Sequence, residues 1–234
     1  MKSSKIIGFN IKFTDKDEEY DIFLSKKQGY YIFANSNTLV EAKYNILLNT
    51  SLKKANLILP DGYPLVFVAR LKGLKKISRI AGPDFTLSAL NYLEKNKITC
   101  CFYGGNQEES KIREILFRKR FPKLSFHSFP EKREIEMMNS MKNKKIDYIF
   151  VSLGSPKQEI WAYKNYKKIK AKIFCVGVAL PYILGEKKRA PKLIQKIYLE
   201  WLYRLITEPV KSWKRYLING PKFAVLSLNE LLSI

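Results

Sequence analysis

An α/β fold with a mostly parallel sheet covered by helices is predicted by three features of this chain. Short apolar runs alternate with amphipathic segments from about residue 29 to residue 178. Turns that carry glycine or proline follow the apolar runs and precede the next helical segment. The chain has 234 residues, of which 46% are hydrophobic, so it can bury one α/β core and carry an appendage. Such alternation is typical of parallel strands joined by helical crossovers, and the composition excludes wholesale disorder.

The expected elements follow in chain order. Residues 5–23 alternate in polarity and predict a short β-hairpin. Parallel strands are expected over residues 30–33, 56–59, 98–103, 146–153 and 172–178. Helices are expected over residues 39–48 and 64–71 and in a segment from about Gln107. This order predicts a Rossmann-like sheet. Ligands of open α/β sheets bind at the carboxyl ends of the strands, so the turns after these runs are the candidate sites.

The chain changes character near residue 187, which predicts an α/β catalytic core over residues 1–187 and a basic helical appendage over 188–234. Residues 187–222 hold ten Lys or Arg but only two acids, Glu200 and Glu208. Apolar residues recur at helical spacing over 193–206, and Pro209 is expected to break that helix. A basic amphipathic segment with tryptophans suits a membrane surface. A terminal helix packed on the core, with a solvated basic face, has the same pattern, and both interpretations stay open.

The net charge predicts a polyanionic partner. The chain has 43 Lys and Arg against 21 Asp and Glu, a formal charge of +22. Nucleic acid, an anionic membrane and phosphate-bearing substrates all fit, and part of the excess can reflect a lysine-rich composition. A nucleic-acid-binding protein that uses the basic surface is the alternative interpretation. No helix-turn-helix and no paired strand aromatics accompany the charge, so no nucleic-acid partner is expected.

The cysteine and histidine counts exclude several classes of site. Cys100, Cys101 and Cys175 cannot build a disulfide framework and are expected to be buried, reduced thiols of a cytoplasmic protein. With His127 as the one histidine, neither a clustered zinc site nor a histidine-based triad is expected. No signal peptide is visible, and the longest uncharged apolar stretch, residues 173–185, is too short to span a bilayer. A soluble or peripheral protein is therefore expected.

Polar residues gather at the predicted strand ends. The strings are Asn35-Ser36-Asn37, Asp61-Gly62, Arg79-Ile80-Ala81-Gly82-Pro83-Asp84, Gly104-Gly105 and Gly154-Ser155-Pro156-Lys157-Gln158-Glu159. Glycine turns before a helix allow a phosphate to approach backbone N–H groups, and a carboxylate in such a cleft can act as a general base. Each string also has a plainer interpretation. Asp61-Gly62 is a common turn, and Ser155-Pro156 is a common helix start, with serine as the cap. Asp15-Lys16-Asp17 is interpreted as a solvated turn rather than a metal-binding Asp-x-Asp.

Taken together, these strings resemble one family. Their order, followed by Arg189-Ala190-Pro191 and Leu199-Glu200-Trp201-Leu202-Tyr203-Arg204-Leu205, is similar to that of the WecG/TagA/CpsF glycosyltransferases. The resemblance covers residues 5–223. The Pro-Lys-Gln-Glu string and the Leu-Glu-Trp-Leu-Tyr-Arg string are its most specific parts.

The resemblance implies an inverting, metal-independent transferase with no cofactor besides its donor. Such enzymes move a sugar, often N-acetylmannosamine, from a UDP-sugar to an undecaprenyl-diphosphate-linked saccharide in teichoic acid, enterobacterial common antigen or capsule assembly. By resemblance, Asp61 is the general base, Asn35 faces the same pocket, Gln158 lies near the donor and Arg79 near the diphosphate. The further substrate-binding positions implied are Asp84, Gly104, Gly105, Gly154, Lys157, Glu159, Arg204, Lys211, Lys214 and Arg215.

The resemblance also implies a cellular location, and this sequence departs from the family pattern in two places. The appendage of such enzymes docks on the membrane, so the protein is expected in the cytoplasm, peripheral on the inner face of the membrane. The oligomeric state stays open, although an exposed amphipathic appendage would favour self-association when no membrane is present. Lys211 and Lys214 stand where the family has arginines, which keeps the charge but loses the bidentate fork. Phe33 stands where the family often has threonine, so the pocket lacks a hydroxyl and the donor sugar stays open.

Overall fold

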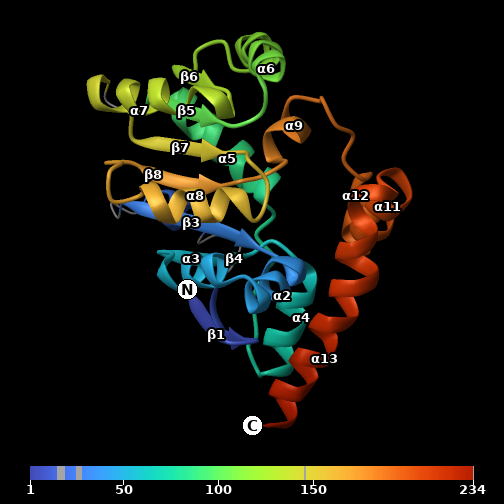
Figure 1. Ribbon diagram of the computed structural model, residues 1–234. Helices are drawn as coiled ribbons and strands as arrows, with labels where there is room; N and C mark the ends of the chain where they lie inside the picture. The colour runs from blue at the N-terminus through green and yellow to red at the C-terminus, as the bar shows by residue number, and fades with distance from the viewer. Residues whose placement is uncertain (15–18, 25–27, 145, 234) are drawn as a thin grey trace.

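The computed structural model describes residues 1–14, 19–24, 28–144 and 146–233. Its centre is a six-stranded sheet in the order β4-β3-β8-β7-β5-β6, in which every neighbouring pair is parallel. The strands are β3 Gly29–Ala34, β4 Leu57–Pro60, β5 Cys100–Tyr103, β6 Phe126–Phe129, β7 Tyr148–Val151 and β8 Lys172–Cys175. The predicted parallel α/β class is confirmed, and all carboxyl ends lie at one edge (Figure 1).

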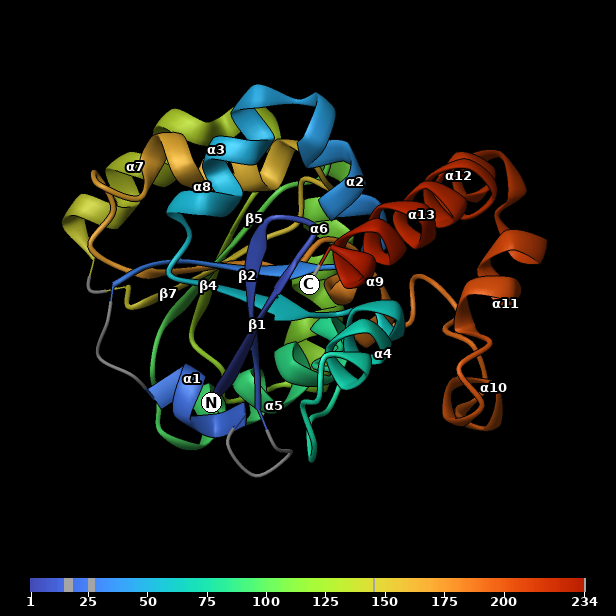
Figure 2. The ribbon, with the colours of Figure 1, turned by 90° about the horizontal axis from the view of Figure 1, so that it is seen from below.

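Helices cover both faces of this sheet (Figure 2). One face carries α2 Ser36–Tyr44, α3 Ile46–Lys54, α7 Glu134–Asn143 and α8 Lys157–Asn165, with α4 Tyr63–Leu71 beside β4. The other carries α1 Glu19–Leu24, α5 Gly82–Lys95, α6 Gln107–Arg120 and α9 Ala179–Ile183. A 3₁₀ turn, Glu131–Arg133, precedes α7. Strands such as β3 and β8 are buried along their whole length, because helices exclude water from both faces.

The N-terminal hairpin is shorter than the sequence predicted. Antiparallel strands β1 Lys2–Ile6 and β2 Phe9–Phe13 form it, so the expected hairpin over 5–23 was wrong in extent. Residues 19–24 form helix α1 instead, because Ile22 and Phe23 are buried on the sheet, where the Phe23 ring stacks on Tyr148 at 4.6 Å. The Asp15-Lys16-Asp17 string lies outside the described residues.

Three further elements differ from prediction. The helix expected over 39–48 is interrupted at Asn45, whose side chain accepts a hydrogen bond from the Leu48 N–H at 3.0 Å and so begins α3. The edge strand β6, which contains His127, was not predicted from the Lys- and Phe-rich sequence around it. Helix α8 begins at Lys157 without a side-chain cap, so the serine-capped helix start at Ser155 was also wrong.

The described part of the appendage, residues 188–233, crosses the carboxyl edge beside β3 and β4 and then runs back along the core (Figure 1). Its elements are α10 Lys192–Lys196, α11 Glu200–Thr207, α12 Pro209–Trp213, a π-helical turn Lys214–Ile218 and α13 Asn219–Leu232. The single helix expected over 193–206 is therefore wrong. The helical conformation is interrupted between α10 and α11, where Tyr198 has a left-handed φ of 63°.

Helix α13 is fastened to the core along its length. Phe223 is buried in the core cluster of the α2 face, and Asn219 donates to the Asn37 side-chain oxygen at 2.7 Å. Near the C-terminus, Glu230 accepts from the Lys72 ammonium at 2.9 Å and from the Ile7 backbone N–H. Within the described residues, no helix is long and apolar enough to cross a membrane.

Because Phe223 is buried, replacing its side chain by a smaller one is expected to destabilise the packing of α13 on the core. Phe223 is 4% exposed, whereas Leu228 on the same helix is 55% exposed. Phe223→Ala is expected to lower the free energy of unfolding by about 3 kcal/mol, because it removes buried apolar area and leaves a cavity. Leu228→Ala, the control, is expected to change it by less than about 0.5 kcal/mol. Denaturant unfolding checks both, and equal losses would contradict the packing of α13.

Candidate active site

A pocket of about 280 Å³, called here the Asp61 pocket, opens where the carboxyl ends of β3 and β4 face the appendage. Asn35 follows β3 and Asp61 follows β4, while Arg79 comes from the loop before α5. The appendage closes the opposite wall with Arg204 and Arg215. Five of the predicted site residues therefore line one cavity, although they are spread over 181 positions of the chain (35 to 215).

The backbone around Asp61 fixes its carboxylate in this cavity. Its N–H donates to the Ala34 carbonyl at 2.8 Å, and its Oδ1 accepts from the Gly82 N–H at 2.9 Å. Gly62 lets the turn approach β3, since a Cβ there would lie 3.0 Å from the Asn35 Cβ. Asn35 itself caps α2, its Oδ1 accepting from the Thr38 N–H at 3.2 Å. In the part of the chain that the structure describes, Asp61 Oδ2 and the Asn35 amide nitrogen have no hydrogen-bond partner, so both are available to a ligand.

Glu200, at the start of α11, joins three arginines of the pocket. Its Oε2 accepts from both terminal nitrogens of Arg79 at 3.2 Å, and its Oε1 accepts from Arg204 Nη2 at 2.9 Å. Arg189 Nε lies 3.6 Å from Oε1. Burial alone would raise the pKa of Glu200, but the guanidinium groups of Arg204, Arg79 and Arg189 outweigh it and lower that pKa. The carboxylate is therefore ionised, and it links α11, which carries both Glu200 and Arg204, to the segments of Arg79 and Arg189.

Arg189 is held from its other side by Asp84. The Arg189 Nη1 and Nη2 donate to the two Asp84 carboxylate oxygens at 2.5 and 3.1 Å, a bidentate pair. Asp84 does not line the Asp61 pocket but fixes a side chain that does. Burial opposes the charge of Arg189, and its bonds and proximity to Asp84, with Glu200 and Asp61 beyond, nonetheless raise its pKa. This guanidinium thus stays charged in the pocket wall.

Aromatic rings form the rest of the appendage wall. Tyr198 stacks on Tyr63 with ring centroids 3.7 Å apart, and the Trp201 and Tyr216 rings are 6.0 Å apart. The Arg215 guanidinium lies 5.5 Å from the Tyr216 ring centroid and, among the described residues, forms no ion pair. Four arginines (79, 189, 204 and 215) face two carboxylates (Asp61 and Glu200) in the lining, an excess of two positive charges. The pocket suits a ligand with at least two negative charges.

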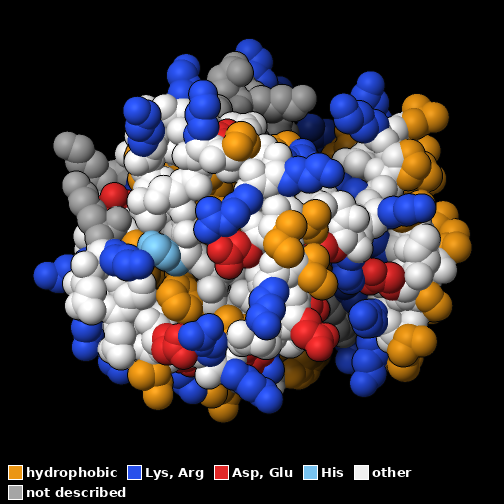
Figure 3. All heavy atoms as spheres, turned by 90° about the horizontal axis from the view of Figure 1, so that it is seen from above, with side chains coloured by type: hydrophobic (Ala, Val, Ile, Leu, Met, Phe, Trp, Pro, Cys, Tyr) orange, Lys and Arg blue, Asp and Glu red, His pale blue; other side chains and the backbone are white. Residues whose placement is uncertain are grey.

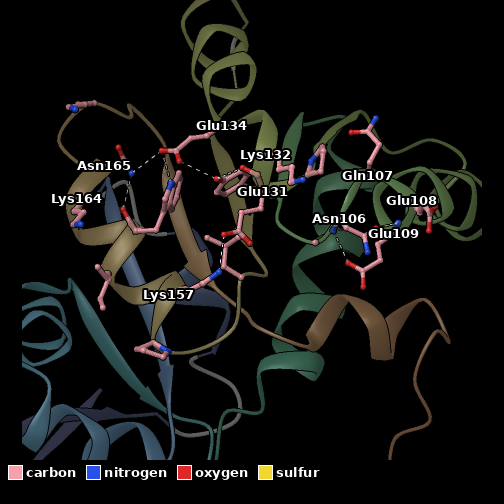
Figure 4. A pocket seen from close by; sticks show the side chains of 18 residues that line it. Asn106, Gln107, Glu108, Glu109, Glu131, Lys132, Glu134, Lys157, Lys164 and Asn165 are labelled. Atoms are coloured by element: carbon pink, nitrogen blue, oxygen red, sulfur yellow. Dashed lines mark hydrogen bonds and ion pairs between the residues drawn. The ribbon is translucent and has the colours of Figure 1, made fainter. Parts of the chain in front are cut away.

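A second and larger cavity, called here the α8 cleft, lies farther along the same edge between α8, α7 and the start of α6. Its volume is about 1400 Å³. Figure 4 shows the side chains that line it. In it the Lys157 ammonium donates to Glu131 at 3.0 Å, and the Trp161 indole N–H donates to Glu134 at 2.9 Å. Its lining holds four lysines (132, 157, 164 and 168) and four glutamates (108, 109, 131 and 134), so its charges balance. An anionic ligand therefore gains less there than in the Asp61 pocket.

The remaining predicted residues do not line the Asp61 pocket. Gly105 and Lys157 line the α8 cleft, while Lys211, Lys214, Gly104 and Gly154 line neither cavity. Gln158 is buried, its Oε1 accepting from the Gly177 N–H at 2.9 Å and its amide nitrogen donating to Glu159 at 2.9 Å. Gln158 therefore shapes the loop after β8.

Glu159 and Phe33 also lie beneath the surface rather than in the cavity. Burial raises the pKa of Glu159, although its bonds to Gln158 and Ser155 favour the charged form. The Phe33 ring packs on Phe85 with centroids 5.0 Å apart and lies 3.9 Å from where a Gly82 Cβ would stand. Phe33 therefore supports the Gly82 turn that binds Asp61, and it contributes no wall to the pocket.

Sequence reasoning missed two charged residues of this site. Glu200 and Arg189 both lie in strings that carried the resemblance, and neither was assigned a role. Their signal was available in Leu199-Glu200-Trp201 and Arg189-Ala190-Pro191, but only the fold brings these strings to Arg79. Within the described residues, no group of three or more His, Cys, Asp or Glu side chains is placed to hold a metal ion. Cys100, Cys101 and Cys175 are free and buried, as predicted.

The comparison with protein families decides the affiliation. The profile described as "Glycosyl transferase WecG/TagA/CpsF family" matches residues 5–234, nearly the whole chain. The chain belongs to this family. The resemblance predicted from the sequence strings is therefore confirmed. In this WecG/TagA/CpsF chain, the Asp61-Gly62 and Leu199–Leu205 strings lie on opposite walls of one pocket.

Three similar proteins carry the same enzyme name, N-acetylglucosaminyldiphosphoundecaprenol N-acetyl-beta-D-mannosaminyltransferase. The Bacillus spizizenii protein is 31% identical over 214 residues, which cover 89% of this chain and 82% of that protein. The Bacillus subtilis protein is 30% identical over 184 residues, covering 76% and 71%. A Staphylococcus aureus protein is 28% identical over 168 residues, covering 70% and 65%. This member of the WecG/TagA/CpsF family is thus similar to transferases over most of its length.

The turns after β5 and β7 offer a test of what their glycines do, through Gly104 and Gly154 respectively. Gly104 has a φ of +131°, and a Cβ there would lie 2.6 Å from the Ser152 carbonyl oxygen. Gly154 also has a positive φ, +76°, but a Cβ there would meet nothing within 4 Å. Both alanine variants carry backbone strain, and only Gly104→Ala adds a backbone clash. Gly104→Ala is expected to lower the free energy of unfolding by about 1–3 kcal/mol more than Gly154→Ala. Equal losses in denaturant titrations would contradict this close approach.

Proposed function

We propose that this protein transfers a sugar, N-acetylmannosamine or a related N-acetylhexosamine, from a UDP-sugar to an undecaprenyl-diphosphate-linked saccharide. Family membership and the enzyme name shared by the relatives support transfer to a polyprenyl-diphosphate acceptor. The observation that carries the proposal is the Asp61 pocket itself, in which one carboxylate faces an excess of guanidinium groups. Assembly of a cell-surface polymer such as teichoic acid or capsule is the corresponding biological role.

Asp61 is the proposed general base. Its Oδ1 is occupied by the Gly82 N–H, so Oδ2 takes the proton from the acceptor hydroxyl. The freed oxygen attacks the anomeric carbon of the donor while the bond from that carbon to the diphosphate oxygen breaks. The electron pair of that bond leaves with UDP. A single displacement of this kind inverts the anomeric configuration.

Arginines are proposed to stabilise the leaving diphosphate. Arg79, Arg204 and Arg215 line the cavity that Asp61 faces, and each guanidinium offers several N–H donors in a planar fork. Such preorganised cations stabilise charge that develops on a leaving group. We propose that these groups do so without a metal ion. Arg215 lines the Asp61 pocket, whereas Lys211 and Lys214 do not.

The size of the cavity limits what it can hold. Ligand pockets commonly measure about 300–1,000 Å³. At about 280 Å³, the Asp61 pocket fits the sugar and diphosphate of the donor better than a whole nucleotide sugar. The nucleoside is therefore proposed to extend from the pocket along the carboxyl edge of the sheet.

We further propose that residues 188–234 hold the protein on an anionic membrane at the cytoplasmic face. Leu193, Ile206 and Val210 are more than two-thirds exposed, and Trp213 is 44% exposed. Figure 3 shows apolar and basic side chains together along the edge that the appendage occupies in Figure 1. Apolar side chains that enter the interface beside lysines are what a peripheral membrane element needs. Family membership and this apolar surface favour a membrane over nucleic acid as the polyanion.

The general-base assignment is tested by Asp61→Asn. An amide keeps the oxygen that accepts from Gly82 but cannot take a proton, so turnover is expected to fall about 10²-fold or more while UDP binding persists. UDP release is measured with a UDP-N-acetylhexosamine panel and a short lipid-diphosphate-linked acceptor, with and without EDTA. Asp147→Asn, an exposed carboxylate that does not line the pocket, is the control. Near-normal turnover by Asp61→Asn would refute the assignment.

Membrane binding is tested by charge insertion at the exposed apolar residues. Ile206→Glu combined with Val210→Glu is expected to weaken co-sedimentation with phosphatidylglycerol vesicles at least about tenfold, because two apolar anchors are lost. Ile46→Glu, on a core helix and 85% exposed like Val210, is the matched control. Equal vesicle binding by the double variant and the control would rule out the appendage as the anchor.

A further inference from the structure

One buried carboxylate of the pocket has no part in the proton transfer or in the leaving group. Glu200 stands among arginines of three segments: Arg79 before α5, Arg189 after α9 and Arg204 on α11. Its side chain is 11% exposed. A carboxylate at such burial is costly unless it is paired, and here the three guanidinium groups supply the pairing.

We propose that Glu200 is a positioning residue, which gathers Arg79, Arg189 and Arg204 into one diphosphate-binding surface opposite Asp61. The inference rests on the proposed function of the Asp61 pocket and adds to it the residue that organises its cations. Glu200 contacts neither the reacting atoms nor the leaving group. It acts through the arginines.

The geometry of the contacts supports positioning. Arg79 is bound through both terminal nitrogens to one oxygen, and Arg204 through a single nitrogen to the other. Arg189 is held by Asp84 and brings its Nε to 3.6 Å from Glu200. That Nε is buried and has no hydrogen-bond partner among the described residues. Each guanidinium has five N–H donors, so the cluster fixes the three groups and still leaves donors for a ligand.

Like charges would separate these arginines without a carboxylate between them. Long arginine side chains lose rotamer entropy when they bind, and a group that is held in place beforehand loses less. The contribution of Glu200 is therefore preorganisation. Because Glu200 belongs to the appendage and Arg79 to the core, the same contact makes the cation cluster depend on the docked appendage.

Positioning and plain electrostatics predict opposite effects of Glu200→Gln. This variant raises the net charge of the pocket by one, so electrostatics alone predicts tighter binding of an anion. Loss of positioning predicts weaker binding, because the three guanidinium groups no longer share a fixed site. Inorganic pyrophosphate is the probe, since it presents the diphosphate without a nucleoside or a sugar.

The experiment compares the wild-type protein, Glu200→Gln and Glu200→Asp by calorimetric titration with pyrophosphate, with kcat and KM and thermal unfolding measured in parallel. Glu200→Gln is expected to weaken pyrophosphate binding and to lower kcat about tenfold or more each, and Glu200→Asp to recover part of both. Glu230→Gln is the matched control, because it removes another carboxylate that ties the appendage to the core, far from the pocket. It is expected to lower the unfolding temperature without changing pyrophosphate affinity.

Four outcomes would overturn the proposal or separate it from the proposed function. Unchanged or tighter pyrophosphate binding by Glu200→Gln would make Glu200 a mere counter-ion. Failure of both Glu200 variants to fold would assign it to the structure alone. A wild-type protein that does not bind pyrophosphate would remove the diphosphate surface. A wild-type protein that binds pyrophosphate but transfers no sugar from any UDP-sugar would refute the proposed function and leave the positioning role intact.

Discussion

The ion pairs of Glu200 with Arg79 and Arg204 are the contact on which the candidate site depends. The pair with Arg79 joins the loop before α5 to helix α11, the pair with Arg204 lies within α11, and both arginines line the pocket opposite the β3 and β4 turns. Salt bridges on a surface contribute little, but this carboxylate is buried and surrounded by cations that lower its pKa. Removal of one partner from such a cluster leaves uncompensated charge, which is far more costly than loss of an exposed pair.

The parallel sheet supplies the other half of the site. Because β3 and β4 are neighbours and run the same way, Asn35 and Asp61 leave the sheet at adjacent points of one edge. The N-terminus of α5 then fixes the Asp61 carboxylate through the Gly82 N–H. The appendage is anchored independently at its far end, where Phe223 is buried and Glu230 meets Lys72. An apolar outer surface and a cationic inner wall thus belong to one segment, which would couple membrane contact to completion of the pocket.

Much of the fold and about half of the site were predictable from the sequence. Strands β3, β4, β5, β7 and β8 are continuous apolar runs, and such runs are the strongest signal of buried parallel strands. Edge strand β6 was missed because it is short and only half-buried. Helix α1 was missed because its signal is short and its burial comes from distant partners such as Tyr148. Asn35 and Asp61 follow the neighbouring parallel strands β3 and β4, so topology alone predicts that they meet. Arg79 lies in the loop between α4 and α5 and not at a strand end as predicted, so its approach depends on that loop. The approach of Arg204 and Glu200 depends on how the appendage folds back, and the break at Tyr198 that allows it has no glycine to mark it.

A crystal structure with UDP bound tests the central claim most directly, namely that the pocket between Asp61 and the Glu200 arginines receives the diphosphate. The account predicts diphosphate oxygens within hydrogen-bond distance of Arg79 or Arg204, with Glu200 still bound to both arginines and the Asp61 carboxylate facing the free β-phosphate end. A diphosphate seated in the α8 cleft beside Gly105 and Lys157, with Arg79 and Arg204 untouched, would contradict it.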